Sequence, residues 1–308
     1  PDLNACISRQ TGANMNTSFE IAGIKQVPKE EPELKKKWYY GKPVFAIFFL
    51  FFIVISCLAC DLIMPKDPTY MDLSNFNQSP NSEFLFGTDT MGRDIFSMIW
   101  SGGRISLWIG IFSAIISTFL GILFGAVSGS APQWADTLLM RLTEILLSVP
   151  GLLMVLLIQA VLGKANVLSI SFVIGITSWM SIAKVVRIEV RQLRNSEYVI
   201  ASKCMGGSFF HILWNHLTPN FISSIMFMVV MNIRSAIIAE STLSFMGIGL
   251  PIETISWGSM LSLSEKALLT NSWWIILIPG GFLLATLLCI TSLGNYLRRN
   301  VNQKNSNL

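Results

Sequence analysis

Apolar residues gather in six long stretches that are separated by polar segments. A helix that crosses the hydrocarbon core of a bilayer needs about 20 predominantly apolar residues. Six stretches approach that length, at residues 44–63, 105–129, 142–163, 165–183, 221–250 and 273–297. The pattern predicts an all-α polytopic membrane protein with six transmembrane helices.

Prolines and glycines inside these stretches predict bends and close packing. Pro150 and Pro279 each remove a helical hydrogen bond, so we expect kinks in the third and sixth spans. Gly247 and Gly249 are expected to break the long fifth stretch near its end. Side-chain-free positions four residues apart predict that another helix packs closely against the second span. These positions are Gly121, Gly125 and Gly129.

Composition supports the membrane assignment and fixes an expected orientation. The 308 residues are 52% hydrophobic and only 13% charged, whereas soluble domains carry roughly 25% charged residues. With the N-terminus inside, sixteen lysines and arginines fall in inside segments and five in outside segments. This bias predicts that both termini are cytoplasmic. It also accounts for the net charge of +4 without a nucleic-acid partner.

The spans set the expected organisation of the chain. Residues 1–43 form a cytoplasmic segment, 44–64 the first transmembrane helix, 65–104 an extracytoplasmic segment, 105–297 a five-helix core with an inside loop at 184–220, and 298–308 a cytoplasmic tail. Within the extracytoplasmic segment, residues 94–100 are expected to form a short helix that follows the turn-rich residues TDTMG. Residues 1–14 precede Met15, a candidate native start, so we expect them to lie upstream of the native chain. The N-terminus does not resemble a secretory signal peptide, because its apolar run begins only at Val44.

No pattern of residues predicts catalysis or a bound metal. Cys57 and Cys60 form a C-x-x-C pair inside the first span, where we expect them to pack as small apolar residues. His211 and His216 are five residues apart, which predicts different faces of a helix, and no carboxylate completes a metal site. The chain also has no phosphate-binding G-x-x-x-x-G-K-[ST] loop and no constellation of nucleophile, base and orienter.

The inside loop combines a basic face with a short apolar helix. Lysine and arginine at spacings of three or four predict positive-inside anchoring; they are Lys184, Arg187, Arg191 and Arg194. Asn195 and Ser196 can then cap a new helix that begins near Glu197. Its expected shared face holds Tyr198, Ala201, Met205 and Phe209, and Gly206-Gly207 weaken or end it. Such a helix suits a groove in another protein.

This loop resembles the EAA loop of ABC-importer permeases. Ala201 matches the first alanine of the motif, Ser202 replaces the second, and Gly206 and Pro219 fit its glycine and proline. Ile200 stands where the family usually has glutamate, and Glu197, about one turn earlier, is a partial substitute. The alternative is a loop that functions without this carboxylate. Thr218 also departs from the usual leucine.

Two longer motifs resemble the second, C-type permease of dipeptide, oligopeptide and nickel importers. The first lies in residues 86–110 and is matched at Gly87, Thr88, Asp89, Gly92, Arg93, Asp94 and Arg104. The second lies in residues 240–261 and is matched at Glu240, Ser244, Gly247, Gly249, Trp257 and Gly258. The segment EILLSVPGLL and the last span are also similar, so the resemblance extends from about Val44 to the end of the sixth span.

The resemblance implies a type I ABC-importer fold and four partners. These are a homologous second permease, two cytoplasmic ATPases that bind ATP and Mg²⁺, and an extracytoplasmic solute-binding protein. The helix at about 197–210 would be the coupling helix that docks on an ATPase. The implied coupling residues are Glu197, Tyr198, Ala201, Ser202, Met205, Gly206, Phe209 and Pro219. The substrate stays open between peptides and nickel or a metal chelate.

Two ionisable residues interrupt the fifth span, where charges are costly. Glu240 belongs to the second motif and is expected to satisfy groups near the outer end. Arg234 is not part of the resemblance, and it could face the substrate pathway or pair with the partner permease. A self-sufficient transporter is the rival class, but no inverted repeat relates the two halves of the chain.

Overall fold

The computed structural model describes residues 43–251, 253–263, 267 and 270–306. Helices make up almost all the regular structure in these residues. The first apolar stretch forms α2 (Val44–Leu58) and α3 (Cys60–Ile63), with a break at Ala59. The segment between α3 and α4 (Ile95–Ser130), which the sequence predicts to be extracytoplasmic and which we call the outer segment, contains a short 3₁₀ helix, η1 (Leu73–Asn75). The expectations for residues 1–42, including the native start, lie outside the described residues.

The second span belongs to a much longer helix than the apolar pattern predicts. Helix α4 runs without interruption from Ile95 to Ser130. The sequence predicts a separate short helix at 94–100, and the structure corrects this because no proline or positive φ interrupts the chain between Ile95 and Ser130. Asp94 caps α4 by accepting hydrogen bonds from the backbone N–H and hydroxyl of Ser97.

The third and fourth apolar stretches are both bent. Helices α5 (Gln133–Ser148) and α6 (Gly151–Leu162) meet at 91° across Val149 and Pro150, which confirms a bend at this proline. Helices α7 (Val167–Ser178) and α8 (Met180–Leu193) meet at 44° around Trp179, where no proline or glycine predicts a break. Of the basic residues that the sequence places in the inside loop, Lys184, Arg187 and Arg191 lie on α8, and Arg194 lies at its C-cap.

The second half of the chain begins with short helices and ends with long ones. Helix α9 (Glu197–Cys204) is followed by α10 (Phe209–Ile212) and by a π-helix, η2 (Leu213–Leu217). Helix α11 (Thr218–Phe245) ends just before Gly247, whose φ of +76° confirms the predicted break. After α12 (Trp257–Ser262), helix α14 (Trp274–Ser306) continues through Pro279 as one helix.

Length and composition identify the elements that can cross a membrane. Among the described residues, 95–130, 209–245 and 274–299 are long and apolar enough, and the two bent pairs raise the number to five. Helix α2 is apolar but has only 15 residues. The all-helical polytopic class is confirmed, whereas the sixth span stays a prediction.

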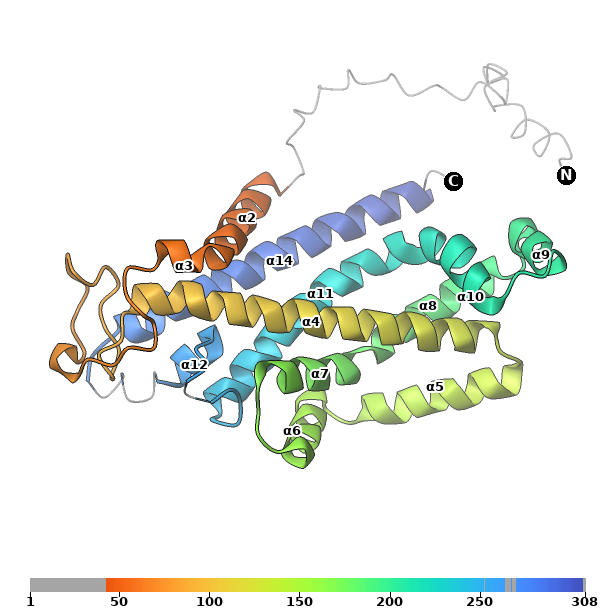
Figure 1. Cartoon of the computed structure of the whole chain (residues 1–308). Coiled ribbons are helices and arrows are strands. Elements are labelled where there is room, and N and C mark those ends of the chain that lie inside the picture. Colours follow the sequence, from red (N-terminus) through yellow and green to blue (C-terminus); the bar gives the residue numbers. More distant parts are fainter. Residues whose placement is uncertain (1–42, 252, 264–266, 268–269, 307–308) are drawn as a thin grey trace, which may run out of the picture. The chain divides into compact units, whose positions relative to one another are not determined.

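Helix α4 packs against α7, α8 and α11 (Figure 1). The glycine stripe of α4 faces α8. A Cβ built on Gly121 would lie 2.7 Å from Ile182, and one on Gly129 would lie 2.9 Å from Val190. The predicted close packing is therefore confirmed, and α8 is its partner helix.

Candidate functional site: signature cluster and coupling surface

The first signature folds the outer segment against the start of α4. Thr88 is fully buried, and its hydroxyl donates to the carbonyl of Asn75 at 2.5 Å. Asp89 accepts hydrogen bonds from the backbone N–H of Arg93 at 2.9 Å and from its Nε at 2.7 Å. Both side chains of this ion pair are at least 96% buried. The pair closes the turn that leads into Asp94.

Two signature glycines allow backbone segments to approach closely. Gly92 has a φ of +72°, and a Cβ there would lie 1.8 Å from the carbonyl oxygen of Asp72. Gly87 has a φ of +75°, and a Cβ there would meet the Trp274 side chain at 2.9 Å. Trp274 also donates its indole N–H to the carbonyl of Thr88 at 3.1 Å. These contacts fix the outer segment to the beginning of α14.

The second signature centres on a buried carboxylate. Glu240 on α11 is 0% exposed and accepts hydrogen bonds from Ser256 at 2.6 Å and from Ser244 at 2.9 Å. Ser106 of α4 and Ser241 donate at 3.4 and 3.5 Å. Glu240 thus joins α4, α11 and the N-cap of α12, in agreement with its expected role of satisfying polar groups.

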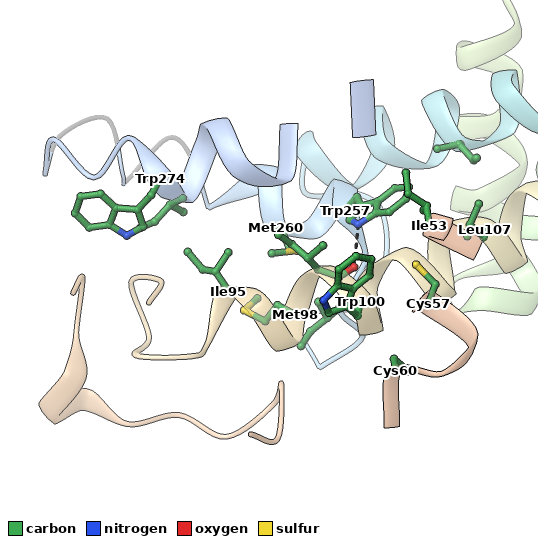
Figure 2. Packing of buried hydrophobic residues seen from close by; sticks show 14 of the residues in the cluster. Ile53, Cys57, Cys60, Ile95, Met98, Trp100, Leu107, Trp257, Met260 and Trp274 are labelled. Atoms are coloured by element: carbon green, nitrogen blue, oxygen red, sulfur yellow. Dashed lines mark hydrogen bonds between the residues drawn. The ribbon is translucent and has the colours of Figure 1, made fainter. Parts of the chain in front are cut away.

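Trp257 connects the two signatures (Figure 2). Its side chain is fully buried, and its indole N–H donates to the carbonyl of Ile99 on α4 at 3.0 Å. Its backbone N–H donates to the hydroxyl of Ser106 at 3.2 Å. Gly103 makes room for the ring, because a Cβ there would lie 2.6 Å from it.

Two glycines of the second signature pack against α11. A Cβ on Gly258 would lie 2.5 Å from the Cα of Ser241, and one on Gly249 would lie 2.3 Å from the hydroxyl of Ser244. Arg104 is the more exposed member of the first signature, and it forms an ion pair with Asp61 at 3.0 Å. The signature residues therefore act mainly as packing and hydrogen-bonding groups.

Helix α9 presents an exposed face next to a buried one. The exposed side chains include Tyr198, Ile200 and Met205, and Met205 is 81% exposed. Val199 and Ser202 are buried. Glu197 and Ala201 are also exposed. Ser202 is thus turned into the chain, which corrects the expectation that it contributes to a contact surface.

The helix at 197–210 that the resemblance implies is wrong in extent, because the chain breaks at Gly206 and Gly207, as the glycine pair itself predicts. Helix α9 ends at Cys204, and Gly206 has a φ of +83°, which an α-helix cannot contain. Phe209 begins the separate helix α10, which Ser208 caps by accepting from the N–H of His211. Ser196 occupies the N-cap position of α9, but its hydroxyl donates to Leu193 instead.

The two glycines of this loop have different roles. A Cβ on Gly206 would meet nothing within 4 Å, so this position requires glycine for its backbone conformation. A Cβ on Gly207 would lie 2.8 Å from the carbonyl oxygen of Ser202. Pro219 is exposed at the second residue of α11.

His211 and His216 lie on the same side of the chain, contrary to the prediction. Their ring centroids are 5.8 Å apart, and Asn215 bonds the Nδ1 of His211 at 2.9 Å. The π-helix η2 explains the difference, because its i→i+5 hydrogen bonding places residues five apart near each other. Within the described part of the chain, no group of three or more His, Cys, Asp or Glu residues could hold a metal.

Three basic residues of α8 and its end contact other parts of the chain. Arg187 and Arg191 pair with the buried Asp136 of α5, and Arg194 donates to the carbonyl of Gly129 at 3.2 Å. Asp136 is not among the residues that the sequence singles out. Asp136 closely follows the glycine stripe of α4, and that stripe packs on α8, which carries periodically spaced arginines. This placement is the signal that could have located it.

Arg234 belongs to α11, and its side chain reaches α14. One guanidinium nitrogen donates to the hydroxyl of Thr291 at 3.2 Å. Its Nε is buried and has no hydrogen-bond partner among the described residues. The structure records no salt bridge to Arg234 from the described carboxylates.

Long apolar helices, a glycine-packed α4–α8 pair and a buried polar cluster around Glu240 are the features of an integral membrane protein. The family described as binding-protein-dependent transport system inner membrane component matches residues 119–303. The chain therefore belongs to this family of membrane transport subunits, and it is a multi-pass protein of the bacterial cytoplasmic membrane.

Individual relatives are similar over most of their length. The chain is 35% identical to the oligopeptide transport system permease protein OppC of Bacillus subtilis, over 82% of each chain. It is 33% identical to the dipeptide transport system permease protein DppC of the same organism, over 84% of this chain and 80% of the relative. Identity to the di/tripeptide permease protein DppC of Pseudomonas aeruginosa is 32%, over 85% and 88%.

Proposed function

We propose that this chain is one of two homologous permease subunits of an ATP-driven importer of di- or oligopeptides. The similarity to three permeases named for peptide transport carries this proposal, because each alignment covers at least four fifths of both chains. Their names do not favour the nickel alternative. The partners would be a second permease, two ATPases that bind ATP and Mg²⁺, and an extracytoplasmic binding protein.

In this proposal the permease pair forms the pathway and works by alternating access. ATP binding closes the ATPase pair and draws the two coupling helices together, which opens the permeases outward. Peptide then passes from the binding protein into the cavity, and hydrolysis restores the inward-facing state. Six spans with both termini in the cytoplasm would place α9 on the ATPase side.

The exposed face of α9 and the start of α10 support a contact with an ATPase. Five large apolar side chains are exposed there, namely Tyr198, Ile200, Met205, Phe209 and Phe210. Val199, on the opposite face, belongs to a buried cluster with residues of α4, α8 and α11. The helix is thus fixed to the bundle on one side and presents an apolar surface on the other, as a helix that docks in a groove requires.

Uptake by the reconstituted four-partner transporter tests the proposed function. Proteoliposomes should import labelled di- or oligopeptides only with the binding protein and ATP, and should not import nickel under the same conditions. Nickel uptake without peptide uptake would contradict the peptide assignment. Peptide movement by this chain alone would contradict the need for ATPases.

Met205→Glu should abolish coupling while the permease folds normally. Met205 is 81% exposed, so a charge costs little in the free chain but is costly in an apolar interface. We expect a loss of ATPase co-purification and a fall in transport by about tenfold or more. A tenfold change corresponds to about 1.4 kcal/mol of binding free energy, and the loss of one central apolar side chain of an interface costs more than this. Met205 is a better site than Gly206, where any side chain would also strain a φ of +83°.

Leu73→Glu is the matched control for this variant. Leu73 is 77% exposed in the outer segment, so the same charge is introduced at a similarly exposed apolar position far along the chain from α9. Normal transport by Met205→Glu would show that α9 is not part of the coupling surface. Equal loss in both variants would point to a general effect of the added charge.

Arg234 is a candidate contact for the peptide carboxylate, because its charge lies in a span without an ion pair among the described residues. Arg234→Ala should weaken import of peptides with a free C-terminus by about 10-fold and leave amidated peptides unchanged, as expected for a lost charge-assisted bond. Arg299→Ala, at an exposed arginine of α14, is the control. A collapse in complex yield would show instead that Arg234 pairs with the second permease.

A further inference from the structure

Helix α5 is attached to the rest of the chain through a small number of groups. Of its 16 residues only Asp136, Met140 and Thr143 are buried. Asp136 lies in its first turn and is 1% exposed, although it is the one charged member of the three. The hydroxyl of Thr143 donates within α5 itself, to the carbonyl of Met140. Asp136 is therefore the main polar connection between α5 and its neighbours.

Asp136 is held by two arginines of α8 and by the last turn of α4. The Nη2 of Arg187 donates to its Oδ2 at 2.6 Å, and the Nη2 of Arg191 lies 2.9 Å from the same oxygen. The Nε of Arg187 and the hydroxyl of Ser128 both donate to Oδ1. Four donors from two helices thus converge on one buried carboxylate, which we call the Asp136 clamp.

The two helices separate beyond this clamp. A groove of about 310 Å³ lies between α5 and α8 and is lined by residues that include Thr137, Arg141, Lys184 and Ile188. Helices that touched along their length would leave no such space. The Asp136 clamp is consequently the joint at which α5 and α8 are held together.

Helix α8 leads directly to the proposed coupling helix. It ends at Leu193, and α9 begins at Glu197. Val199 of α9 packs in one buried cluster with Val186 and Val190 of α8. Arg194 adds a hydrogen bond to the carbonyl of Gly129 at the end of α4. A force on α9 therefore acts first on α8 and on the inner end of α4.

We propose that Asp136 is a positioning residue that makes α5 follow the coupling helix. Displacement of α9 by an ATPase passes to α8, through Arg187 and Arg191 to Asp136, and along α5 to the 91° bend that joins it to α6. The three charges suit this role because parting them would leave the buried carboxylate of Asp136 without a partner. The inference rests on the proposed function, since it requires that α9 contacts an ATPase.

Asp136→Asn in the complete transporter tests the clamp. The amide keeps the size of the side chain but removes the charge that holds two guanidinium groups. We expect an assembled complex whose basal ATP hydrolysis changes by less than twofold, while peptide imported per ATP falls by about tenfold, within the usual range of coupling between sites. Asp136→Glu, which retains the charge, should restore most of this ratio.

Glu144→Gln is the matched control on the same helix. Glu144 pairs with Arg141 at 2.8 Å, but the two side chains are 47% and 73% exposed, and such pairs contribute little. Its transport per ATP should equal that of the unmodified protein. If Asp136→Asn also retains the unmodified ratio while peptide import is normal, the clamp has no coupling role. If the unmodified transporter imports no peptide, the proposed function fails instead.

A distance measurement decides the question even if Asp136→Asn does not assemble. Spin labels on encoded keto amino acids at Thr137 and Ile188 would report the separation of α5 and α8 across the groove. In the otherwise unmodified transporter we expect the same distance with and without ATP, because the clamp moves both helices together. A change in that distance on ATP binding would overturn the proposal.

Discussion

Glu240→Ala should prevent accumulation of the folded transporter. The substitution removes the acceptor for Ser106, Ser244 and Ser256, all of which are buried. Each buried donor left without an acceptor costs about 1–3 kcal/mol, and the cavity adds to this cost. Because native proteins are stable by only about 5–15 kcal/mol, we expect the yield after size-exclusion chromatography to fall below detection.

Two further substitutions isolate the cause of that loss. Glu240→Gln retains an acceptor oxygen and the side-chain volume, so it should give an intermediate yield and a lowered Tm. Glu144→Ala removes an exposed carboxylate and should change the yield little. A normal yield for Glu240→Ala would contradict the interpretation of Glu240 as the polar centre that joins α4, α11 and α12.

Gly92→Ala should disrupt the outer segment more than its small size suggests. The new methyl group would lie 1.8 Å from the carbonyl oxygen of Asp72, a backbone atom that cannot rotate away. The φ of +72° adds about 1–2 kcal/mol of strain for any residue with a Cβ. We expect faster proteolysis within residues 65–94 and a loss of peptide uptake.

Gly163→Ala separates these two contributions. Gly163 has a φ of +81°, but a Cβ there would meet nothing within 4 Å. This variant should show only the conformational cost of a sparsely populated backbone region, on the order of 1–3 kcal/mol. Equal proteolysis of the two variants would show that the contact between Gly92 and Asp72 does not hold the segment.

The apolar pattern predicts which parts of the chain are helical because burial in lipid demands long apolar runs. It correctly places breaks at Pro150 and near Gly247, and it identifies the close packing of the glycine stripe. Its error at residues 94–100 has a physical cause. Polar residues at the outer end of α4 mark the edge of the apolar run, but they do not end a helix whose first turn Asp94 caps.

Tertiary structure determines the features that local pattern does not contain. The bend at Trp179 has no local breaker, and the π-helix that brings His211 near His216 has no simple residue code. Ser202 turns inward at a point where Gly207 leaves room for it. Neither apolar spacing nor a helix-breaking residue marks these features, so helical periodicity alone could not predict them.

The candidate sites likewise include some that the sequence locates and one that only the fold reveals. Resemblance located the residues of both signatures, and the structure shows that Glu240 and Trp257 meet α4 in one buried cluster. The Asp136 clamp was not predicted, because the basic residues of α8 were interpreted as membrane anchors. Only the fold shows that Arg187 and Arg191 reach a carboxylate about 50 positions earlier in the chain.

The uninterrupted length of α4 has a consequence for communication across the membrane. Its 36 residues extend about 54 Å, whereas the hydrocarbon core is about 30 Å thick. One end begins at Asp94 beside the outer segment, and the other ends next to the Asp136 clamp. Thermodynamic linkage is reciprocal. If the chain works in the proposed assembly and α4 carries the signal, docking of a loaded binding protein at one end must raise the affinity for ATP at the other end by the same factor by which ATP strengthens that docking.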